Sequence, residues 1–275
     1  MKAVINSFGE EWNRFDQERF LPSDERRSQF LRYFNTPHFK ILKSLKKVNA
    51  IDIGAGSGRW SSEIIHHLEI ERLTLVEPSS AFKLLKKIFS NNNKVSLINE
   101  SIEDLLIKNK KLRESFDLVY CFGVLHHTSS ISKGFSEICK FAKPGGIIFC
   151  YLYYNLDNRP IFYKLIYSLS ILPRIFISRL PSFLKNCLCD LIAIFIYLPF
   201  VNLARLFPKN KSIPLNSYAD RSFFSIRTDS RDRFGTRVER RISKIEIKKL
   251  CLKNGLEDIQ FSEDYPYWVF SAKKI

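Results

Sequence analysis

The sequence lacks the cysteine and histidine spacings that would point to a metal site or a disulfide framework. Its six cysteines include no C-x-x-C pair, and no metal-ligand spacing is present. These absences argue against a disulfide-stapled or zinc-dependent fold and favour buried thiols. The first eleven residues also lack the apolar run of a secretory leader. We therefore expect an ordered protein on the cytoplasmic side of a membrane, with no bound metal.

The glycine-rich turn at residues 54–58 lacks two familiar phosphate-binding patterns. A dinucleotide loop, G-x-G-x-x-G, would need a glycine where the chain has Arg59. The G-x-x-x-x-G-K-[ST] loop is absent as well. The turn follows an apolar run, and Asp52 stands two residues before Gly54. A carboxylate there would repel a pyrophosphate but could accept a hydrogen bond from an ammonium group.

A second acid follows the next apolar segment. Residues 73–77 end in Glu77, 25 residues after Asp52. An acid at the end of the second strand is placed to hold two ribose hydroxyls. Glycines allow the loop backbone to approach a ligand closely, here at Gly54, Gly56 and Gly58. A ribose, an amino-acid end and no pyrophosphate together describe S-adenosylmethionine.

Five segments, in order, resemble the class I S-adenosylmethionine-dependent methyltransferases. They are residues 52–58, 77–79, 99–105, 116–127 and 141–146. The resemblance implies that the cofactor contacts Asp52, the three loop glycines, Glu77, Ser101, Ile102 and Phe122. Members of that family often carry an acid at the position of Ser101. We therefore expect the Ser101 hydroxyl, or Glu100 or Glu103 in its place, to contact the adenine.

Seven apolar segments alternate with helix-like segments. They are residues 50–54, 73–77, 95–99, 118–122, 147–153, 256–261 and 268–272. This alternation predicts an α/β, Rossmann-like, seven-stranded and mostly parallel sheet with helices on both faces, plus a largely helical insertion. The expected units are an N-terminal helical cap (1–49), the cofactor-binding core (50–154), the insertion (155–242) and a closing helix with two strands (243–275).

The first part of the insertion is apolar and basic. Residues 159–211 contain eight Lys or Arg and one acid, Asp190, a net charge of +7 within a chain of +16. Residues 188–206 are nearly all apolar and, as a helix, would be roughly 29 Å long. A span needs about 20 apolar residues, but Asp190, Pro199 and Asn202 argue against one. A helix pair lying in the interface, with basic residues toward anionic head groups, is favoured.

Two other interpretations of the insertion stay open. It can be a lid whose apolar faces pack on the core or on a second subunit. A nucleic-acid partner is the usual expectation for a basic protein, but here the positive excess lies among long aliphatic runs, which disfavours it. The oligomeric state does not follow from the sequence.

The second part of the insertion, residues 220–241, contains seven arginines and four acids. Arginine suits phosphate or carboxylate recognition, although most such charge runs are solvated, salt-bridged surfaces. The charges alternate with aromatic residues and a glycine, as in an ordered loop. Together with residues 8–15 and 151–160, this segment resembles a bacterial subgroup of these methyltransferases with a long insertion after the fifth strand. The resemblance implies a reaction class and no substrate.

The resemblance places the reacting methyl group just beyond the fourth strand. His126 and His127 lie there and are candidate bases, or they only shape the loop. We expect further residues to face the same cleft or to clamp an anionic acceptor. The candidate substrate-binding residues are Tyr153, Tyr154, Asn155, Arg159, Asp232 and Arg233. His66 and His67 are expected on the surface.

The leading hypothesis is an S-adenosylmethionine-dependent methyltransferase that modifies an oxygen or nitrogen atom of a lipid-linked or glycan acceptor. It would act as a peripheral protein on an anionic membrane surface, at the inner face. One alternative is a soluble small-molecule methyltransferase with a packed lid. Another is a methyltransferase-like protein that binds its ligand or a partner without turnover.

Overall fold

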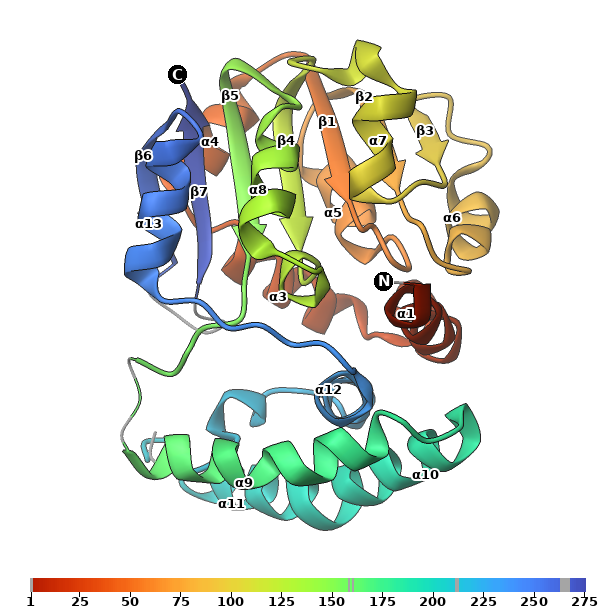
Figure 1. Cartoon of the computed structure of the whole chain (residues 1–275), viewed down its shortest axis with the longest axis vertical. Coiled ribbons are helices and arrows are strands. Elements are labelled where there is room, and N and C mark those ends of the chain that lie inside the picture. The colour runs from red at the N-terminus through yellow and green to blue at the C-terminus, as the bar shows by residue number, and fades with distance from the viewer. Residues whose placement is uncertain (1, 158, 160, 211–212, 263–267) are drawn as a thin grey trace.

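A single seven-stranded sheet organises the chain (Figure 1). The computed structural model describes residues 2–157, 159, 161–210, 213–262 and 268–275. The strands are β1 (Val48–Ile53), β2 (Ile70–Val76), β3 (Val95–Ile98), β4 (Phe116–Phe122), β5 (Ala142–Tyr151), β6 (Leu256–Phe261) and β7 (Val269–Lys274). Their order is β3-β2-β1-β4-β5-β7-β6. The pairs among β1 to β5 are parallel, and β7 runs antiparallel to both neighbours. The predicted fold class is confirmed.

Helices cover both faces of the sheet. On one face lie α3 (Ser23–Tyr33), α4 (Pro37–Ser44), α5 (Arg59–His67) and α6 (Phe82–Phe89). On the other lie α7 (Ile102–Lys108), α8 (Ile131–Cys139) and α13 (Lys244–Lys253). Alternate residues of a strand point to opposite faces. In β1, Ala50 therefore packs under α5, while Ile51 and Ile53 pack under α7 and α8.

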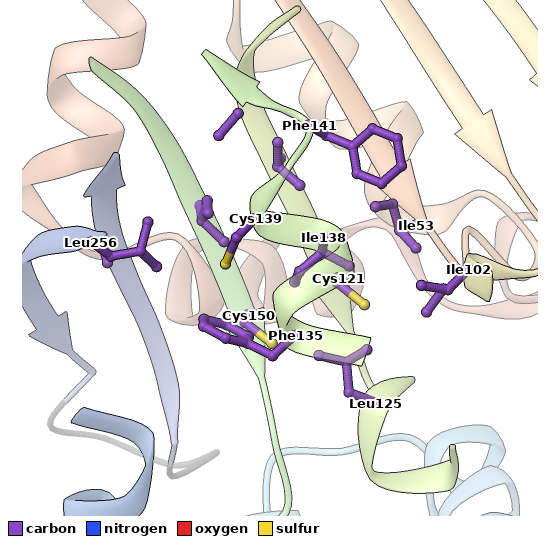
Figure 2. Packing of buried hydrophobic residues seen from close by; sticks show 14 of the residues in the cluster. Ile53, Ile102, Cys121, Leu125, Phe135, Ile138, Cys139, Phe141, Cys150 and Leu256 are labelled. Atoms are coloured by element: carbon purple, nitrogen blue, oxygen red, sulfur yellow. The ribbon is translucent and has the colours of Figure 1, made fainter. Parts of the chain in front are cut away.

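Buried thiols occupy the core between the sheet and α8. Figure 2 shows Cys121, Cys139 and Cys150 beside Phe135 and Ile138. Burial raises the pKa of the Cys121 and Cys150 thiols well above the ordinary range, so both stay neutral and pack as small apolar groups. Of the six cysteines, Cys187 is exposed, unlike the buried thiols that the sequence favoured.

The N-terminal helix α1 (Lys2–Arg14) lies across the carboxyl end of the sheet, and α2 (Gln17–Phe20) leads from it to α3 (Figure 1). A Cβ atom on Gly56 would lie 3.0 Å from the Trp12 ring, so the helix sits directly on the glycine loop. One on Gly9 would lie 2.5 Å from the Ser80 hydroxyl, which places α1 against the end of β2 as well. The N-terminal segment thus covers the edge of the sheet where a ligand should bind.

The insertion forms a separate helical layer (Figure 1). Its elements are α9 (Ile161–Ile177), α10 (Ser182–Ile192), the π-helical turn η3 (Ala193–Tyr197), α11 (Leu198–Leu206), η4 (Asn216–Tyr218) and α12 (Phe223–Gly235). Of these, α10, η3 and α11 form one continuous helix, Ser182–Leu206. Helix α12 packs on α9, α10 and α1, between this layer and the sheet.

The interpretation of residues 220–241 as an ordered loop is wrong for most of the segment, because α12 is a helix. The Ser222 hydroxyl caps it by accepting the N–H of Ser225. Ile226, Ser230 and Phe234 recur at four-residue spacing and are buried. The Ser230 hydroxyl donates to the Cys189 carbonyl oxygen at 2.7 Å. Because charged residues alternate through the segment, the sequence interpretation missed the four-residue spacing of these buried side chains.

Candidate active site

The loop between β1 and α5 takes a conformation that favours glycine. Gly54 and Gly56 have φ values of +82° and +56°. A Cβ atom on Gly54 would also lie 2.3 Å from Val124 Cγ2. Gly58 is the N-cap of α5. The loop therefore packs tightly between β1, the segment after β4 and helix α1.

Glu77 bridges the loop and the end of β2. Its carboxylate is buried and accepts the N–H of Gly56 and the N–H of Ser79, both at 2.9 Å. A carboxylate has roughly four lone-pair positions, so two remain for hydroxyl groups. Glu77 lines a cavity of about 100 Å³, which we call the Glu77 cavity.

The residues predicted at the adenine edge line the same cavity. Ser101, Ile102, Glu100 and Glu103 all border it. The Ser101 hydroxyl accepts the N–H of Asp104 at 3.3 Å and so caps α7. Glu100 pairs with Lys108 at 2.8 Å. The Glu77 cavity thus has one carboxylate at the end of β2 and a polar edge at the start of α7.

Asp52 lines neither this cavity nor the one described next, although the sequence placed it at the ligand. Its carboxylate is buried and accepts the Ser61 hydroxyl at 2.6 Å. Burial raises its pKa to about 7, with the hydrogen bonds from Ser61 and Tyr120 opposing that rise. The cause is strand alternation, which points Asp52 to the same face as Ala50, underneath α5.

A second cavity, of about 160 Å³, lies between the sheet, the N-terminal helices and α12. We call it the Arg59 cavity. Its lining combines aromatic and charged side chains, among them Tyr33, Arg59, Trp60, Tyr151, Tyr153, Arg221, Asp229 and Asp232. Both cavities are bordered by Phe8, Trp12, Phe122 and Gly123, so they adjoin. Phe122 was predicted to contact the cofactor, and it lies at this junction.

His127 is the candidate base that reaches a cavity. It borders the Glu77 cavity, and its Nδ1 lies 2.6 Å from the Val238 carbonyl oxygen. A carbonyl only accepts, so Nδ1 carries the proton and Nε2 presents a lone pair. Nε2 lies 3.8 Å from Asp232 Oδ1. Burial lowers the pKa of His127, which keeps the ring neutral at pH 7.

His126 is buried away from both cavities. Its ring stacks on Tyr153 with the centroids 3.7 Å apart. Neither ring nitrogen has a hydrogen-bond partner among the described residues. Burial lowers its pKa well below the ordinary value, with the charges of His127 and Arg241 acting in the same direction. This arrangement fits a packing role.

Residues 51–148 match the family model of a methyltransferase domain. That segment runs from β1 into β5 and includes the glycine loop, Glu77 and His127. No curated protein sequence matches the chain.

Solved structures share the fold at low sequence identity. One belongs to the complex of the Haloferax volcanii Trm112 methyltransferase activator with a candidate methyltransferase. The similarity has 12% identity, covers 92% of this chain and 94% of that chain, and has a TM-score of 0.50. An O-methyltransferase family protein from Burkholderia thailandensis is 13% identical over 94% of this chain and 63% of its own, with a TM-score of 0.49. The domain match supports S-adenosylmethionine-dependent methyl transfer as the general activity.

Two of the candidate substrate-binding residues in this methyltransferase fold reach a cavity. Tyr153 and Asp232 border the Arg59 cavity, and the Tyr153 hydroxyl donates to Asp232. The other four border neither cavity. Tyr154 packs on Trp268, Asn155 accepts the N–H of Asp157, Arg159 lies over the Tyr163 ring and Arg233 lies over the Tyr167 ring.

The arginines of α12 do not form the expected anion clamp, because protein groups already hold them. Arg227 pairs with Asp190 at 2.8 Å. Arg231 is buried and donates to Asn186 and Ser7. These contacts join α12 to α10 and α1, so the arginines attach the insertion to the N-terminal helix.

The sequence interpretation missed the N-terminal helix as part of the site. Val4, Ile5, Phe8 and Trp12 line the Glu77 cavity. Their spacing is typical of one apolar helix face. The sequence could therefore have predicted a helix here, but not the cavity that this helix covers. His67 was expected on the surface, but it stacks on Phe30 with the ring centroids 4.8 Å apart. His66 is exposed as predicted.

Replacing His126 with phenylalanine is expected to make the protein less sensitive to acid. The folded-state pKa of His126 is below its unfolded value, so the unfolded chain binds more protons and stability falls as the pH drops below about 6.5. Phenylalanine keeps the stack on Tyr153 and cannot be protonated. Its melting temperature should match wild type at pH 8 and exceed it at pH 5. Exposed His66 changed to phenylalanine is the control, and the idea fails if both variants respond alike.

Proposed function

We propose that this methyltransferase modifies an oxygen or nitrogen atom of a lipid-linked or glycan acceptor at a membrane surface. The observation that carries the proposal is a group of strongly exposed apolar side chains on the insertion, whose helices α9 to α11 lie away from the sheet (Figure 1). We call it the membrane face. It consists of Ile161, Leu165, Leu169, Leu172, Phe176, Phe183, Leu184, Phe195, Ile196, Leu206 and Phe207.

The exposure of these side chains favours a further binding surface over a lid packed on the core of the same chain. Ile161 is 84% exposed and Phe183 is 80% exposed. Soluble monomers rarely expose contiguous apolar patches beyond a few hundred Å². Exposed Lys164, Arg179 and Lys209 accompany the patch, and each basic residue near an anionic surface contributes about 1 kcal/mol.

The helix Ser182–Leu206 is long and apolar enough to cross a bilayer, with a mean hydropathy of 2.1. Its packing favours an in-plane position. Asp190 pairs with Arg14 of α1 and Arg227 of α12, which ties one side of the helix to the rest of the protein. Exposed apolar side chains elsewhere on this helix, among them Leu184, Phe195 and Leu206, belong to the membrane face. A helix with one polar, packed side and one apolar side lies in the interface.

The residues of the site fit S-adenosylmethionine, which when bound supplies an activated methyl group. Glu77 has two lone-pair positions free for the ribose hydroxyls, and Ser101 and Ile102 border the adenine end. We expect His127 Nε2, which is neutral and lies 3.8 Å from Asp232 Oδ1, to take the proton of an acceptor hydroxyl or amine. The Tyr153–Asp232 pair would orient that acceptor.

Vesicle co-sedimentation tests the membrane proposal. The full-length protein should pellet with vesicles that contain phosphatidylglycerol, less so with pure phosphatidylcholine, and less at high salt because exposed charges are screened. Equal recovery in the supernatant with and without vesicles would contradict the proposal. If the protein does not bind vesicles and light scattering shows a dimer, the exposed apolar residues pack between two subunits instead. That result would support the packed-lid alternative.

A further inference from the structure

Arg59 is a half-buried cation that pairs with no carboxylate among the described residues. It is the first residue of α5, directly after the glycine loop, and it borders the Arg59 cavity. Its guanidinium forms no ion pair with any carboxylate in the part of the chain that the structure describes. It stacks on the Trp60 ring at 4.1 Å and makes one long hydrogen bond, 3.4 Å, to the Gln29 side-chain oxygen. Burial lowers its pKa to about 10, so it stays charged at neutral pH.

Two buried acceptor atoms in the same cavity also lack partners. They are Glu11 Oε2, from α1, and Gln17 Oε1, from α2. The two side chains are 2% and 3% exposed, so solvent does not satisfy them. The closest cation to Glu11, Arg231, is 3.6 Å away, beyond hydrogen-bond distance. Burial and the charge of Asp232 raise the pKa of Glu11. A buried polar group without a partner destabilises the protein. A ligand that forms hydrogen bonds with these two atoms would remove that cost.

A zwitterion would satisfy both kinds of group at once. Its carboxylate needs a cation such as Arg59, and its ammonium needs acceptors such as Glu11 and Gln17. The Arg59 cavity adjoins the Glu77 cavity at Phe122 and Gly123, so a ligand whose ribose lies at Glu77 can continue into it. The N-terminus of α5 adds a partial positive charge at the same point.

We propose that the Arg59 cavity holds the amino-acid end of the cofactor, with its carboxylate on Arg59 and its ammonium facing Glu11 and Gln17. This assignment rests on the proposed function, since it takes S-adenosylmethionine as the ligand. It also gives the ammonium group acceptors other than Asp52, which the sequence analysis had predicted to bind it. Helix α1 then contributes a cofactor contact and closes the site.

Arg221 provides a matched comparison within the same cavity. It borders the Arg59 cavity and, unlike the half-buried Arg59, is buried. In contrast to Arg59, it has two acids nearby, Glu25 at 3.9 Å and Asp220 at 3.7 Å. Its charge is therefore balanced within the protein. Of the two cavity arginines, Arg59 is the one with no ion pair to the part of the chain that the structure describes.

Calorimetry with two ligands tests the assignment. S-adenosylhomocysteine carries the amino-acid end, and 5′-methylthioadenosine lacks it. The Arg59→Met variant of the full chain should bind S-adenosylhomocysteine about 10- to 100-fold more weakly, with methylthioadenosine affinity unchanged. Arg59→Lys keeps the charge but loses the fork, and it should fall between Arg59→Met and wild type. Glu11→Gln should also weaken S-adenosylhomocysteine alone, and Arg27→Met, at an exposed arginine of α3 that borders neither cavity, should weaken neither ligand.

The outcomes separate this inference from the proposed function. Unchanged S-adenosylhomocysteine affinity in folded Arg59→Met and Arg59→Lys overturns the assignment, and so does an equal loss for both ligands. Either result would leave the methyltransferase proposal standing, because wild type still binds. If wild type binds neither ligand, the proposed function fails and this inference fails with it. Circular dichroism establishes that each variant is folded.

Discussion

Glu77→Gln is expected to weaken S-adenosylhomocysteine binding by about 100-fold or more. The carboxylate would accept two ribose hydroxyls, and each hydrogen bond to a charged group contributes about 1.5–3 kcal/mol. Glutamine also places an N–H₂ group against the N–H of Gly56 or Ser79, where Glu77 now accepts both. The titration is calorimetric, with a melting curve for each variant, because Glu77 is buried and its loss also disturbs the loop.

Asp52→Asn is the contrast for Glu77→Gln. Asp52 is an acid of the same motif, but it bonds Ser61 behind the loop and borders neither cavity. Asparagine keeps an oxygen for that hydroxyl, so cofactor affinity should change little. An equal loss of affinity in the two variants would show that Asp52 contacts the ligand, which contradicts its placement under α5.

Substituting aspartate for Leu172, Phe183 and Phe195 together is expected to abolish vesicle binding. These side chains are 74%, 80% and 72% exposed on the membrane face, so the fold does not depend on them. Burying one large apolar side chain contributes about 1.5–3 kcal/mol. Losing three and adding negative charge should lower partitioning to anionic vesicles by more than about 100-fold. Co-sedimentation measures the loss.

A matched double variant distinguishes the membrane face from exposed apolar residues in general. Ile107 on α7 and Leu252 on α13 are 72% and 66% exposed, and both helices lie on the sheet, away from the insertion (Figure 1). Changing both to aspartate should leave co-sedimentation as in wild type. If the triple variant still pellets with vesicles, the membrane face is not the binding surface.

Local patterns were enough to predict the sheet and the part of the Glu77 cavity that the strand ends form. The strand predicted at residues 256–261 matches β6, and the glycine loop, Glu77 and the start of α7 meet at the carboxyl ends of the strands. These features depend on period-two alternation and turn residues, which short segments encode. Strand β5 begins at Ala142, earlier than the predicted residue 147, because Ala142 already pairs with Phe116.

The Arg59 cavity could not be predicted in the same way, because tertiary packing assembles it. Its walls come from the N-terminal helices, the start of α5 and α12, which are far apart in the sequence. Glu11 approaches Arg231 only because α12 folds back beneath the sheet onto α1.

The position of Asp52, in contrast, could have been predicted. The alternation of Ala50 and Asp52 with Ile51 and Ile53 was visible in the sequence and already indicated that its side chain points under α5.

Calorimetric titration of the unmodified protein with S-adenosylhomocysteine tests the central claim most directly. The account predicts saturable binding at one site per chain, which S-adenosylmethionine displaces. Folded protein that gives no binding heat at any temperature, and no shift in melting temperature with either ligand, would contradict it. In that case the Glu77 cavity would be no cofactor site.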